Sequence, residues 1–248
     1  MSILLVDVGN TRVKWALMRN GKLTQQRAAS HQGWQADDFA KRILGRARGI
    51  ERVIVASVGG RRLDRYLAAA VRRILGVAPE FVVSTRQLGG VVTAYTEPWR
   101  LGVDRLVAVI GARRMVPGCA VCVVDVGTAM TIDLVDVKGG HVGGAIIPGP
   151  RLMVATLLRS TSGIRKRARG GGSGRSLFAR NTAAAMELGA RYSAAAIIDR
   201  AVKEARTTLG AVPRLLVTGG AAGELQALIR TLHLNVPDLV LRGLAALI

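Results

Sequence analysis

Short apolar runs alternate with amphipathic stretches along the 248-residue chain. Leu4–Val6 ends in a polar turn and leads into a second apolar stretch over Val13–Met18, which predicts a β-hairpin at the start of the chain. Arg61–Leu75 carries its apolar residues on one face at helical spacing and so predicts an amphipathic helix. The remaining elements predicted for the first half are a strand over Lys22–Ala28, a helix over Asp37–Arg48, strands over Val53–Ser57 and Phe81–Ser84, and a helix over Asp104–Met115.

The opening of the chain is echoed near its middle. Leu4–Thr11 reads LLVDVGNT, and Cys122–Ala129 reads CVVDVGTA. Each copy is an apolar strand that ends in Asp-x-Gly and continues into a second apolar stretch, so each predicts a β-hairpin. Two such hairpins, one opening each half of the chain, indicate a duplicated domain.

The second half follows the same plan. After its hairpin, the predicted elements are a hairpin region that reaches Ile147 and stops at Pro148–Pro150, a long helix over Asn181–Leu209, a strand over Arg214–Thr218 and a helix over Ala221–Leu232. Pro117 and Gly118 end the preceding helix, so we expect domains over residues 1–116 and 117–248. Three strands followed by alternating helices and strands is the order of a ribonuclease-H-like α/β domain.

The two Asp-x-Gly turns favour phosphate binding. Gly9 and Gly127 allow the backbone to approach a phosphate closely, and Asp7 and Asp125 can hold a metal ion directly or through water. Further donors and positive charge beside the first turn come from Asn10, Thr11, Arg12 and Lys14. One such turn is usually just a hairpin, whereas two copies that each open a domain indicate a phosphate site. The chain lacks the G-x-x-x-x-G-K-[ST] pattern of P-loop enzymes.

Two other segments have both a plain and a functional interpretation. Thr218–Gly220 is either a simple strand-to-helix turn or a tight turn that admits the flat ring of an adenosine. Asp104 at a predicted helix start is either a cap that complements the helix dipole or a general base beside a phosphate-clamping Arg105. Tyr95, on the preceding loop, is either a surface anchor or a substrate contact.

Taken together, the motifs resemble those of type III pantothenate kinases. In the family's order, the matching segments are Asp7–Thr11, Gly102–Arg105, Asp125–Ala129, Gly143–Gly149, Asn181–Thr182 and Thr218–Gly220. The resemblance spans nearly the whole chain. It implies an α/β fold of the actin/sugar-kinase type, with two duplicated ribonuclease-H-like domains facing a nucleotide cleft.

The resemblance also implies a reaction, which is ATP-dependent phosphorylation of pantothenate to 4'-phosphopantothenate, the first step towards coenzyme A. The ATP contacts it implies are Asp7, Gly9, Asn10, Thr11, Arg12, Lys14 and Thr128, with Gly219 and Gly220 at the adenosine. The implied pantothenate contacts are Tyr95, Gly102, Val103, Asp104, Arg105 and Thr182. Asp104 is then the proton acceptor and Asp125 the ligand of a monovalent cation, K⁺ or NH₄⁺, while Mg²⁺ accompanies ATP. The family is homodimeric, with the substrate pocket completed near the dimer interface.

The charge balance is strongly basic, with 36 Lys and Arg against 16 Asp and Glu and a net charge of +20. Such an excess attracts polyanions. Aromatic residues make up only 4% of the chain, which is poor for stacking on single strands, so we expect no specific nucleic-acid binding. The most basic segment, Arg165–Arg175, is rich in glycine and indicates a mobile loop.

The remaining features indicate a cytoplasmic protein. No apolar stretch is long enough to span a membrane, and Asp7 interrupts the first apolar run too early for a secretory signal. Cys119 and Cys122 form a C-x-x-C without a second Cys/His pair, so we interpret them as apolar residues entering a buried strand.

Two other functions stay open. One is a non-catalytic accessory regulator of gene expression from the same family, and the other is a sugar kinase or an exopolyphosphatase of the same superfamily. The intact Gly102–Arg105 motif and both phosphate turns favour the pantothenate kinase over these alternatives.

Overall fold

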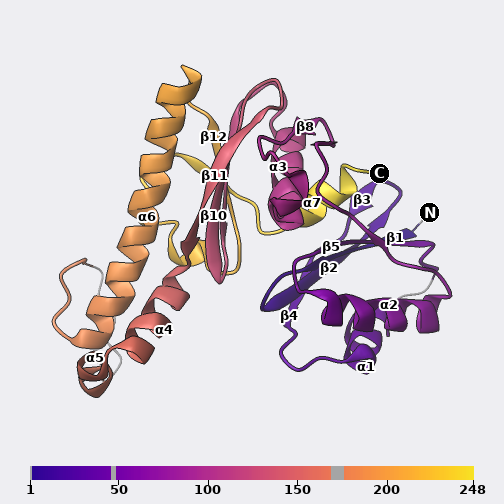
Figure 1. Cartoon of the computed structure of the whole chain (residues 1–248), viewed down its shortest axis with the longest axis horizontal. Coiled ribbons are helices and arrows are strands. Elements are labelled where there is room, and N and C mark those ends of the chain that lie inside the picture. The colour runs from indigo at the N-terminus through magenta and orange to yellow at the C-terminus, as the bar shows by residue number, and fades with distance from the viewer. Residues whose placement is uncertain (1, 46–48, 169–175) are drawn as a thin grey trace. The chain divides into compact units, whose positions relative to one another are not determined.

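The computed structural model describes residues 2–45, 49–168 and 176–248, which form two compact units (Figure 1). The first unit comprises the chain up to Pro117 together with Gly139–His141 and Asp238–Ile248. The second comprises Gly118–Lys138 and Val142–Pro237.

The first unit is built on a mixed sheet with the strand order β3-β2-β1-β5-β6, in which β4 also pairs with β2. Its strands are β1 (Ser2–Val8), β2 (Arg12–Arg19), β3 (Lys22–Leu23), β4 (Arg27–Ser30), β5 (Arg52–Ser57) and β6 (Glu80–Phe81). β1 is antiparallel to β2 and parallel to β5, so the predicted hairpin lies at the centre of the sheet. The predicted third strand is divided into β3 and β4.

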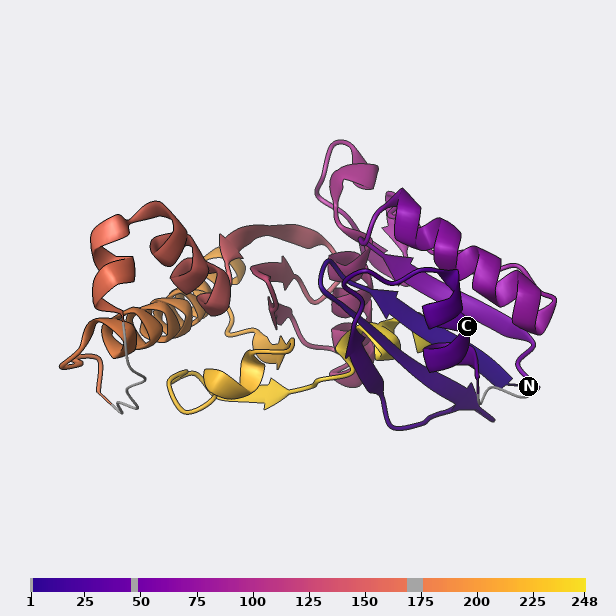
Figure 2. The same ribbon diagram turned by 90° about the horizontal axis from the view of Figure 1, so that it is seen from below.

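Helices cover both faces of this sheet (Figures 1 and 2). On one face, α1 (Ala36–Phe39), its π-helical continuation η1 (Ala40–Leu44) and α2 (Arg61–Leu75) form a core with the strands that includes the fully buried Phe39 and Leu67. The helix predicted over residues 37–48 consists of a short α-helix followed by a π-helical turn. Its last three residues, 46–48, lie outside the described part of the chain.

The other face packs against α3 (Val103–Met115) and α7 (Leu239–Ala245). These two helices cross with almost no space between their backbones. A side chain at Gly111 would approach the Leu239 carbonyl oxygen to 2.6 Å, and one at Gly243 would collide with the Val107 carbonyl oxygen. The predicted division at residues 116 and 117 placed α7 in the second domain, whereas this glycine-mediated crossing makes it part of the first unit.

A small hairpin between β6 and α3 does not follow from the apolar pattern. It consists of β7 (Gln87–Leu88) and β8 (Val91–Val92), and the 3₁₀ turn η2 (Pro98–Arg100) follows it. The loop between β8 and η2 carries Tyr95, and α3 begins shortly after η2.

The second unit repeats the sheet of the first, with the order β11-β10-β9-β12-β13. Its strands are β9 (Val121–Val126), β10 (Ala129–Val135), β11 (His141–Pro148), β12 (Arg214–Thr218) and β13 (His233–Asn235). β9 is antiparallel to β10 and parallel to β12, as β1 is to β2 and β5. The prediction of a duplicated ribonuclease-H-like α/β fold is confirmed.

The helices of the second unit are α4 (Pro150–Ser160), α5 (Ser162–Arg167), α6 (Thr182–Leu209) and the 3₁₀ turn η3 (Ala222–Glu224). The long α6 runs along the sheet beside α4 (Figures 1 and 2), and its Ile198 is fully buried in a core with Val124 and Val217. α6 matches the predicted helix. Asn181 is its N-cap, with the side-chain oxygen accepting from the Ala184 amide at 2.9 Å.

One prediction for this unit was wrong, and another falls largely outside the described residues. The predicted helix over residues 221–232 is reduced to η3 and turns, and the Asp199 carboxylate on α6 accepts from the amides of Arg230 and Thr231 where this segment ends. The basic segment predicted to be a mobile loop begins instead as α5, and its residues 169–175 lie outside the described part of the chain. Among the described residues, no helix is long and apolar enough to cross a membrane.

Candidate active site

The first Asp-x-Gly turn, which was predicted to bind phosphate, joins β1 to β2. The Gly9 amide donates to the Arg12 carbonyl oxygen at 3.0 Å and closes the turn, while the side chains of Asn10, Thr11 and Arg12 are exposed. Asp7 is buried at the end of β1, and the Lys14 ammonium on β2 lies 3.7 Å from its carboxylate. The turn therefore presents donors outward above an internal ion pair.

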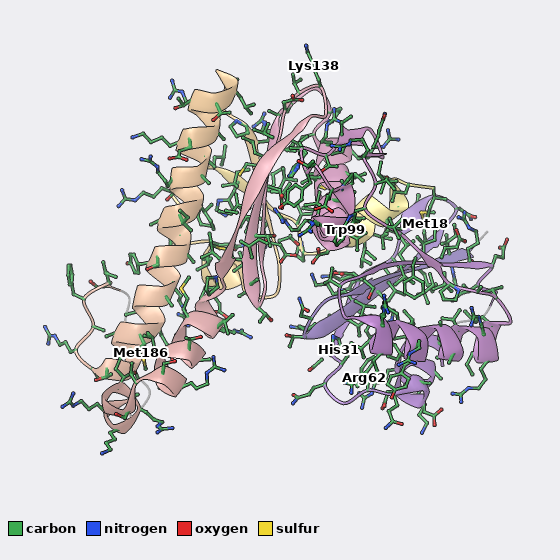
Figure 3. All side chains as sticks on the ribbon, in the orientation of Figure 1. Met18, His31, Arg62, Trp99, Lys138 and Met186 are labelled. Carbon is green, nitrogen blue, oxygen red and sulfur yellow. The ribbon has the colours of Figure 1, made fainter. Side chains whose placement is uncertain are left out.

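His31 supports this turn from behind. Its ring is buried, and Nε2 donates to the Gly9 carbonyl oxygen at 2.7 Å, while the His31 amide donates to the Thr11 carbonyl oxygen at 3.2 Å. Figure 3 labels His31 where the chain leaves β4. Sequence reasoning missed this residue, since a lone histidine gives no sign that it contacts a backbone carbonyl 22 positions earlier.

The second Asp-x-Gly turn joins β9 to β10 and is held by backbone hydrogen bonds. The Gly127 amide donates to the Ala129 carbonyl oxygen at 3.0 Å, and the Gly149 amide donates to the Thr128 carbonyl oxygen at 2.9 Å. Gly149 precedes α4, and any side chain there would collide with the Gly127 carbonyl oxygen. Thr128 is exposed.

The Thr218–Gly220 turn packs against the end of β9. Gly219 has a φ of +101°, and a side chain at this position would collide with the Asp125 carboxylate and lie 2.5 Å from the Val126 amide nitrogen. The Ala221 amide then donates to the Val126 carbonyl oxygen at 3.0 Å. Only glycine permits this approach, which brings the predicted adenosine turn next to the predicted cation ligand, Asp125.

A polar cluster lies at the start of α3. The Asp104 carboxylate accepts from the Arg105 amide at 2.8 Å, and the buried Arg105 guanidinium donates to the Tyr95 hydroxyl at 3.1 Å. The guanidinium carbon is 5.9 Å from the centre of the Tyr95 ring, within the range of a cation–π contact. The structure thus brings together three residues that the sequence singled out separately. A side chain at Gly102 would approach the Asp104 carboxylate to 2.7 Å, so glycine leaves that oxygen accessible.

Two residues that sequence reasoning missed hold the Tyr95 loop. Arg86 donates to the carbonyl oxygens of Thr93, Tyr95 and Thr96 at 3.2, 2.8 and 2.9 Å. The buried His141 ring lies 6.0 Å from the Tyr95 ring, centre to centre. Neither residue belongs to a recognisable motif. The Tyr95 loop has no sequence pattern of its own, and His141 is far from it in the chain.

The predicted site residues are divided between the two units. The first unit contains Asp7 to Lys14, Tyr95 and Gly102 to Arg105. Thr128, Asp125, Gly219 and Gly220 belong to the second, as does Thr182, the first residue of α6. Within the units, Asp7 forms an ion pair with Lys14 and Arg105 donates a hydrogen bond to Tyr95. The backbone of Gly219 packs against Asp125.

A pocket of about 320 Å³ lies in the second unit next to η3. It is lined by Pro150, Arg151, Val154, Glu187, Arg191 and Glu224. Glu224 pairs with Arg151 at 2.6 Å and with Arg191 at 3.6 Å, so the wall nearest to η3 carries paired charges.

The two cysteines lie in β9 and just before it. Burial, with a smaller contribution from the negative charge of Asp133, raises the pKa of the Cys122 thiol to about 12, so the thiol is protonated at neutral pH. Cys119 is only partly exposed and is a free thiol. Across residues 2–45, 49–168 and 176–248, no group of three or more His, Cys, Asp or Glu side chains is placed to hold a metal ion.

Comparison with known proteins gives a consistent assignment. The model of the type III pantothenate kinase family matches residues 3–204. The type III pantothenate kinase of Nitrosococcus oceani is 36% identical over 98% of this chain and 92% of its own length. That of Halorhodospira halophila is 37% identical over 97% of this chain and 95% of its own.

Solved structures share the fold. A Campylobacter jejuni protein described as a Baf family transcriptional activator superposes with a TM-score of 0.59 at 21% identity, covering 97% of this chain and 94% of its own. A ROK family glucokinase from Streptomyces griseus superposes with a TM-score of 0.54 at 13% identity, covering 99% of this chain and 98% of its own. These likenesses confirm the actin/sugar-kinase fold. The sequence matches over nearly its full length show that the chain belongs to the type III pantothenate kinase family.

Proposed function

We propose that this chain transfers the γ-phosphoryl group of ATP to the primary hydroxyl of pantothenate, yielding 4'-phosphopantothenate and ADP, as the first step of coenzyme A biosynthesis. The observation that carries the proposal is the cluster of Asp104, Arg105 and Tyr95 in a chain that belongs to this family. A carboxylate on the first turn of a helix, beside a buried cation, is suited to act on an alcohol next to a phosphate.

The two phosphate turns supply the ATP site. Phosphoryl transfer depends mainly on positioning and charge neutralisation, and exposed donors at both turns provide these. They are Asn10, Thr11 and Arg12 at the first turn and Thr128 at the second. When bound with ATP, Mg²⁺ neutralises the β- and γ-phosphates. The Asp7 carboxylate, at the strand end beside the first turn, is an oxygen donor of the kind that Mg²⁺ takes directly or through water.

Asp104 is the general base in this mechanism. Its carboxylate accepts the proton of the pantothenate hydroxyl as the new O–P bond forms and the bond to the ADP oxygen breaks. The buried Arg105, aligned by the Tyr95 hydroxyl, orients the anionic substrate and shields the developing charge. The remaining pantothenate contacts that the family resemblance implies are Gly102, Val103 and Thr182.

The adenosine contact is Gly219 and Gly220. The left-handed Gly219 exposes the backbone of the turn next to η3, where a flat ring can lie against it. The pocket at Arg151 and Glu224 adjoins this turn through η3 and offers polar groups for the outer edge of the nucleoside.

Other family properties belong to the same proposal. Asp125 binds a monovalent cation, K⁺ or NH₄⁺, and the protein acts as a cytoplasmic homodimer. The high positive charge of the chain serves no specific nucleic-acid site.

The test is a substrate comparison. Purified protein with ATP, Mg²⁺ and K⁺ is given pantothenate, glucose or polyphosphate, and phosphorylated products are identified by mass spectrometry. Rapid formation of 4'-phosphopantothenate alone is the expected result. Phosphorylation of glucose, hydrolysis of polyphosphate, or no turnover with any substrate would overturn the proposal.

A further inference from the structure

Tyr95 lies on a segment without regular secondary structure, yet it contacts a buried side chain of the candidate site. Residues 93–97 connect β8 to η2 and form neither helix nor strand. From this loop, the Tyr95 hydroxyl accepts from the buried Arg105 guanidinium at 3.1 Å. A loop residue can hold another side chain in place only if its own backbone is fixed. The contacts that fix this loop therefore bear on the site.

Arg86, directly before β7, provides the main contacts to the loop. Its Nη1 donates to the carbonyl oxygens of Thr93 and Tyr95 at 3.2 and 2.8 Å, and its Nη2 donates to that of Thr96 at 2.9 Å. In the opposite direction, the Thr93 amide donates to the Arg86 carbonyl oxygen at 3.0 Å. One guanidinium thus holds the backbone on both sides of Tyr95.

The charge of Arg86 is not paired with a carboxylate. Arg73 of the first unit, for comparison, pairs with the Asp37 carboxylate at 2.6 Å. Arg86 forms no such ion pair within residues 2–45, 49–168 and 176–248. A hydrogen bond from a charged donor is roughly twice as strong as a neutral one, and a planar guanidinium can span several acceptors in a fixed arrangement. Arg86 is therefore well suited to hold a backbone loop.

The ring of Tyr95 has a second contact, from the hairpin that joins β10 to β11. The buried His141 ring lies 6.0 Å from it, centre to centre, which is within the range of an aromatic contact. The hairpin is attached to the strand before the loop, because the Val92 amide donates to the Gly139 carbonyl oxygen at 2.9 Å. Gly139–His141 and the loop belong to the same unit. The backbone and the ring of Tyr95 are thus fixed by residues from different parts of the chain.

Tyr95 transmits this arrangement to Arg105. It contacts the guanidinium through its hydroxyl and also through its ring, whose centre is 5.9 Å from the guanidinium carbon. The Asp104 carboxylate, in contrast, accepts from the main-chain amide of Arg105 within the first turn of α3. A displaced loop should therefore move the Arg105 guanidinium and leave the proposed proton acceptor in place.

We propose that Arg86 is a positioning residue of the pantothenate site, which fixes Tyr95 and, through it, the orientation of Arg105. The inference rests on the proposed function for the identity of the substrate. Arg86 does not touch the reacting atoms and acts only on the cation that orients the anionic substrate. Loss of an interaction that the bound substrate and the transition state share raises KM and leaves kcat unchanged. The expected signature is therefore a raised KM for pantothenate with little change in kcat.

Steady-state kinetics of two Arg86 variants tests this signature. In Arg86→Ala, the KM for pantothenate should rise about tenfold or more, because small misplacements of an orienting group are costly. The kcat and the KM for ATP should stay close to wild type. Arg86→Lys keeps the charge but carries all its donors on one nitrogen, so it should restore only part of the loss. Full restoration by lysine would show that only the charge matters and would overturn the assignment.

Arg73→Ala is the matched control. It removes the same charge from the first unit, but the partner of Arg73 is the exposed Asp37 on α1. The KM for pantothenate in this variant should equal that of wild type. An equal rise in both variants would refute a specific role for Arg86, because it would indicate an effect of net charge alone.

A double-mutant cycle tests the route through Tyr95. Tyr95→Phe removes the hydroxyl that accepts from Arg105 and should raise the KM for pantothenate by itself. Residues that act through one another have non-additive effects, so Arg86→Ala should add little in the Tyr95→Phe background. Additive effects would mean that Arg86 acts on the substrate directly, which would contradict the positioning role.

Hydrogen–deuterium exchange measures the loop without any turnover. In Arg86→Ala, the amides of residues 93–97 should exchange faster, because the loop loses three of its hydrogen bonds. Arg73→Ala should show no such change, and unchanged exchange in Arg86→Ala would overturn the proposal. If Arg86→Ala does not fold, as judged by circular dichroism, Arg86→Lys decides the point. A raised KM with faster exchange in Arg86→Lys would support the role, and wild-type values would refute it.

The outcomes separate this inference from the proposed function. A wild-type protein that phosphorylates pantothenate, with an unchanged KM in Arg86→Ala, would refute the positioning role and leave the kinase intact. A wild-type protein that is inactive on pantothenate would refute the proposed function, whereas faster exchange of the loop in Arg86→Ala would still support the control of Tyr95 by Arg86.

Discussion

The two Asp-x-Gly turns have the same sequence motif but are held by different contacts. In the first unit, Val8 pairs with Val13 across a turn of Gly9–Arg12, whereas in the second Val126 pairs with Met130 across the shorter Gly127–Ala129. The first is supported by a histidine ring on the Gly9 carbonyl oxygen. The second is supported by the close approach of the Gly149 backbone.

This difference shows that two copies of one hairpin can acquire different charges and different structural supports. The first turn carries a permanent positive charge in Lys14 and exposed side-chain donors, and a side chain supports it. The second has hydroxyls around its carboxylate and depends on glycines for both of its close contacts. We expect the two turns to respond differently when their supports are removed, and both to differ from the α3 cluster.

The largest effect should come from Asp104, which belongs to neither turn. Asp104→Asn keeps the size of the side chain but removes its charge, so kcat should fall by about 10²–10⁴-fold while the affinity for an ATP analogue changes little. Steady-state kinetics and calorimetric titration measure the two quantities. If Asp104 only stabilises the helix start, the variant should keep most of its turnover, because Asn caps a helix about as well as Asp.

Gly149→Val should damage the second turn selectively. Its branched side chain collides with the Gly127 carbonyl oxygen, and overpacking of this kind costs about 1–3 kcal/mol. We expect lower stability in urea denaturation and a raised KM for ATP. The control is Gly189→Ala, because a methyl group at this α6 position would meet no atom outside its own helix within 4 Å. That change should stabilise the protein slightly, and equal damage from both variants would refute the specific role of Gly149.

His31→Ala should loosen the first turn by removing the donor to the Gly9 carbonyl oxygen. Loss of one partner of a buried hydrogen bond costs about 1–3 kcal/mol. The KM for ATP should rise while the affinity for K⁺ at the second turn stays unchanged. His31→Gln, which keeps an N–H donor, should recover part of the loss. A KM for ATP unaffected by His31→Ala would show that the turn is rigid without the ring.

The smallest effect concerns the segment between β12 and β13, which contains only η3 where the first unit has α2 between β5 and β6. Burial opposes ionisation of Asp199, but hydrogen bonds from the Thr231 hydroxyl and amide and from the Arg230 amide outweigh it and hold the pKa of the carboxyl below its ordinary value of 3.8. A lowered folded-state pKa gives stability that is present above the ordinary pKa and is lost as the pH falls through the lowered one.

Asp199→Asn should therefore lower the stability at pH 7 by less than about 1 kcal/mol, because the carboxylate is partly exposed and solvent screens its charge. Its difference from wild type should shrink below pH 3.8, which urea denaturation at neutral and acid pH would measure. Asp37→Asn is the comparison, because Asp37 pairs with Arg73 on the exposed surface, where an ion pair contributes little. A constant difference at all pH values would refute the role of the Asp199 charge.

Local pattern in the sequence determined the elements and the motifs. The hairpins, α2, α6 and both Asp-x-Gly turns could be predicted because each depends on residues close in the chain, through periodicity, caps and glycines. The duplication could be predicted because two copies of one motif are visible without any structure.

Contacts between distant residues were decided only by the tertiary structure. Gly111 and Gly243 allow α7 to pack closely on α3, and Asp199 of α6 binds the amides of Arg230 and Thr231 at the end of the segment that was predicted to be a helix. His31 and Arg86 became site residues only when the fold placed them against backbone carbonyls. A backbone carbonyl has no sequence signature, and close packing of two helices depends on surfaces far apart in the chain. The strand register likewise showed which residues lie opposite the two aspartates, namely Lys14 opposite Asp7 and Thr131 opposite Asp125.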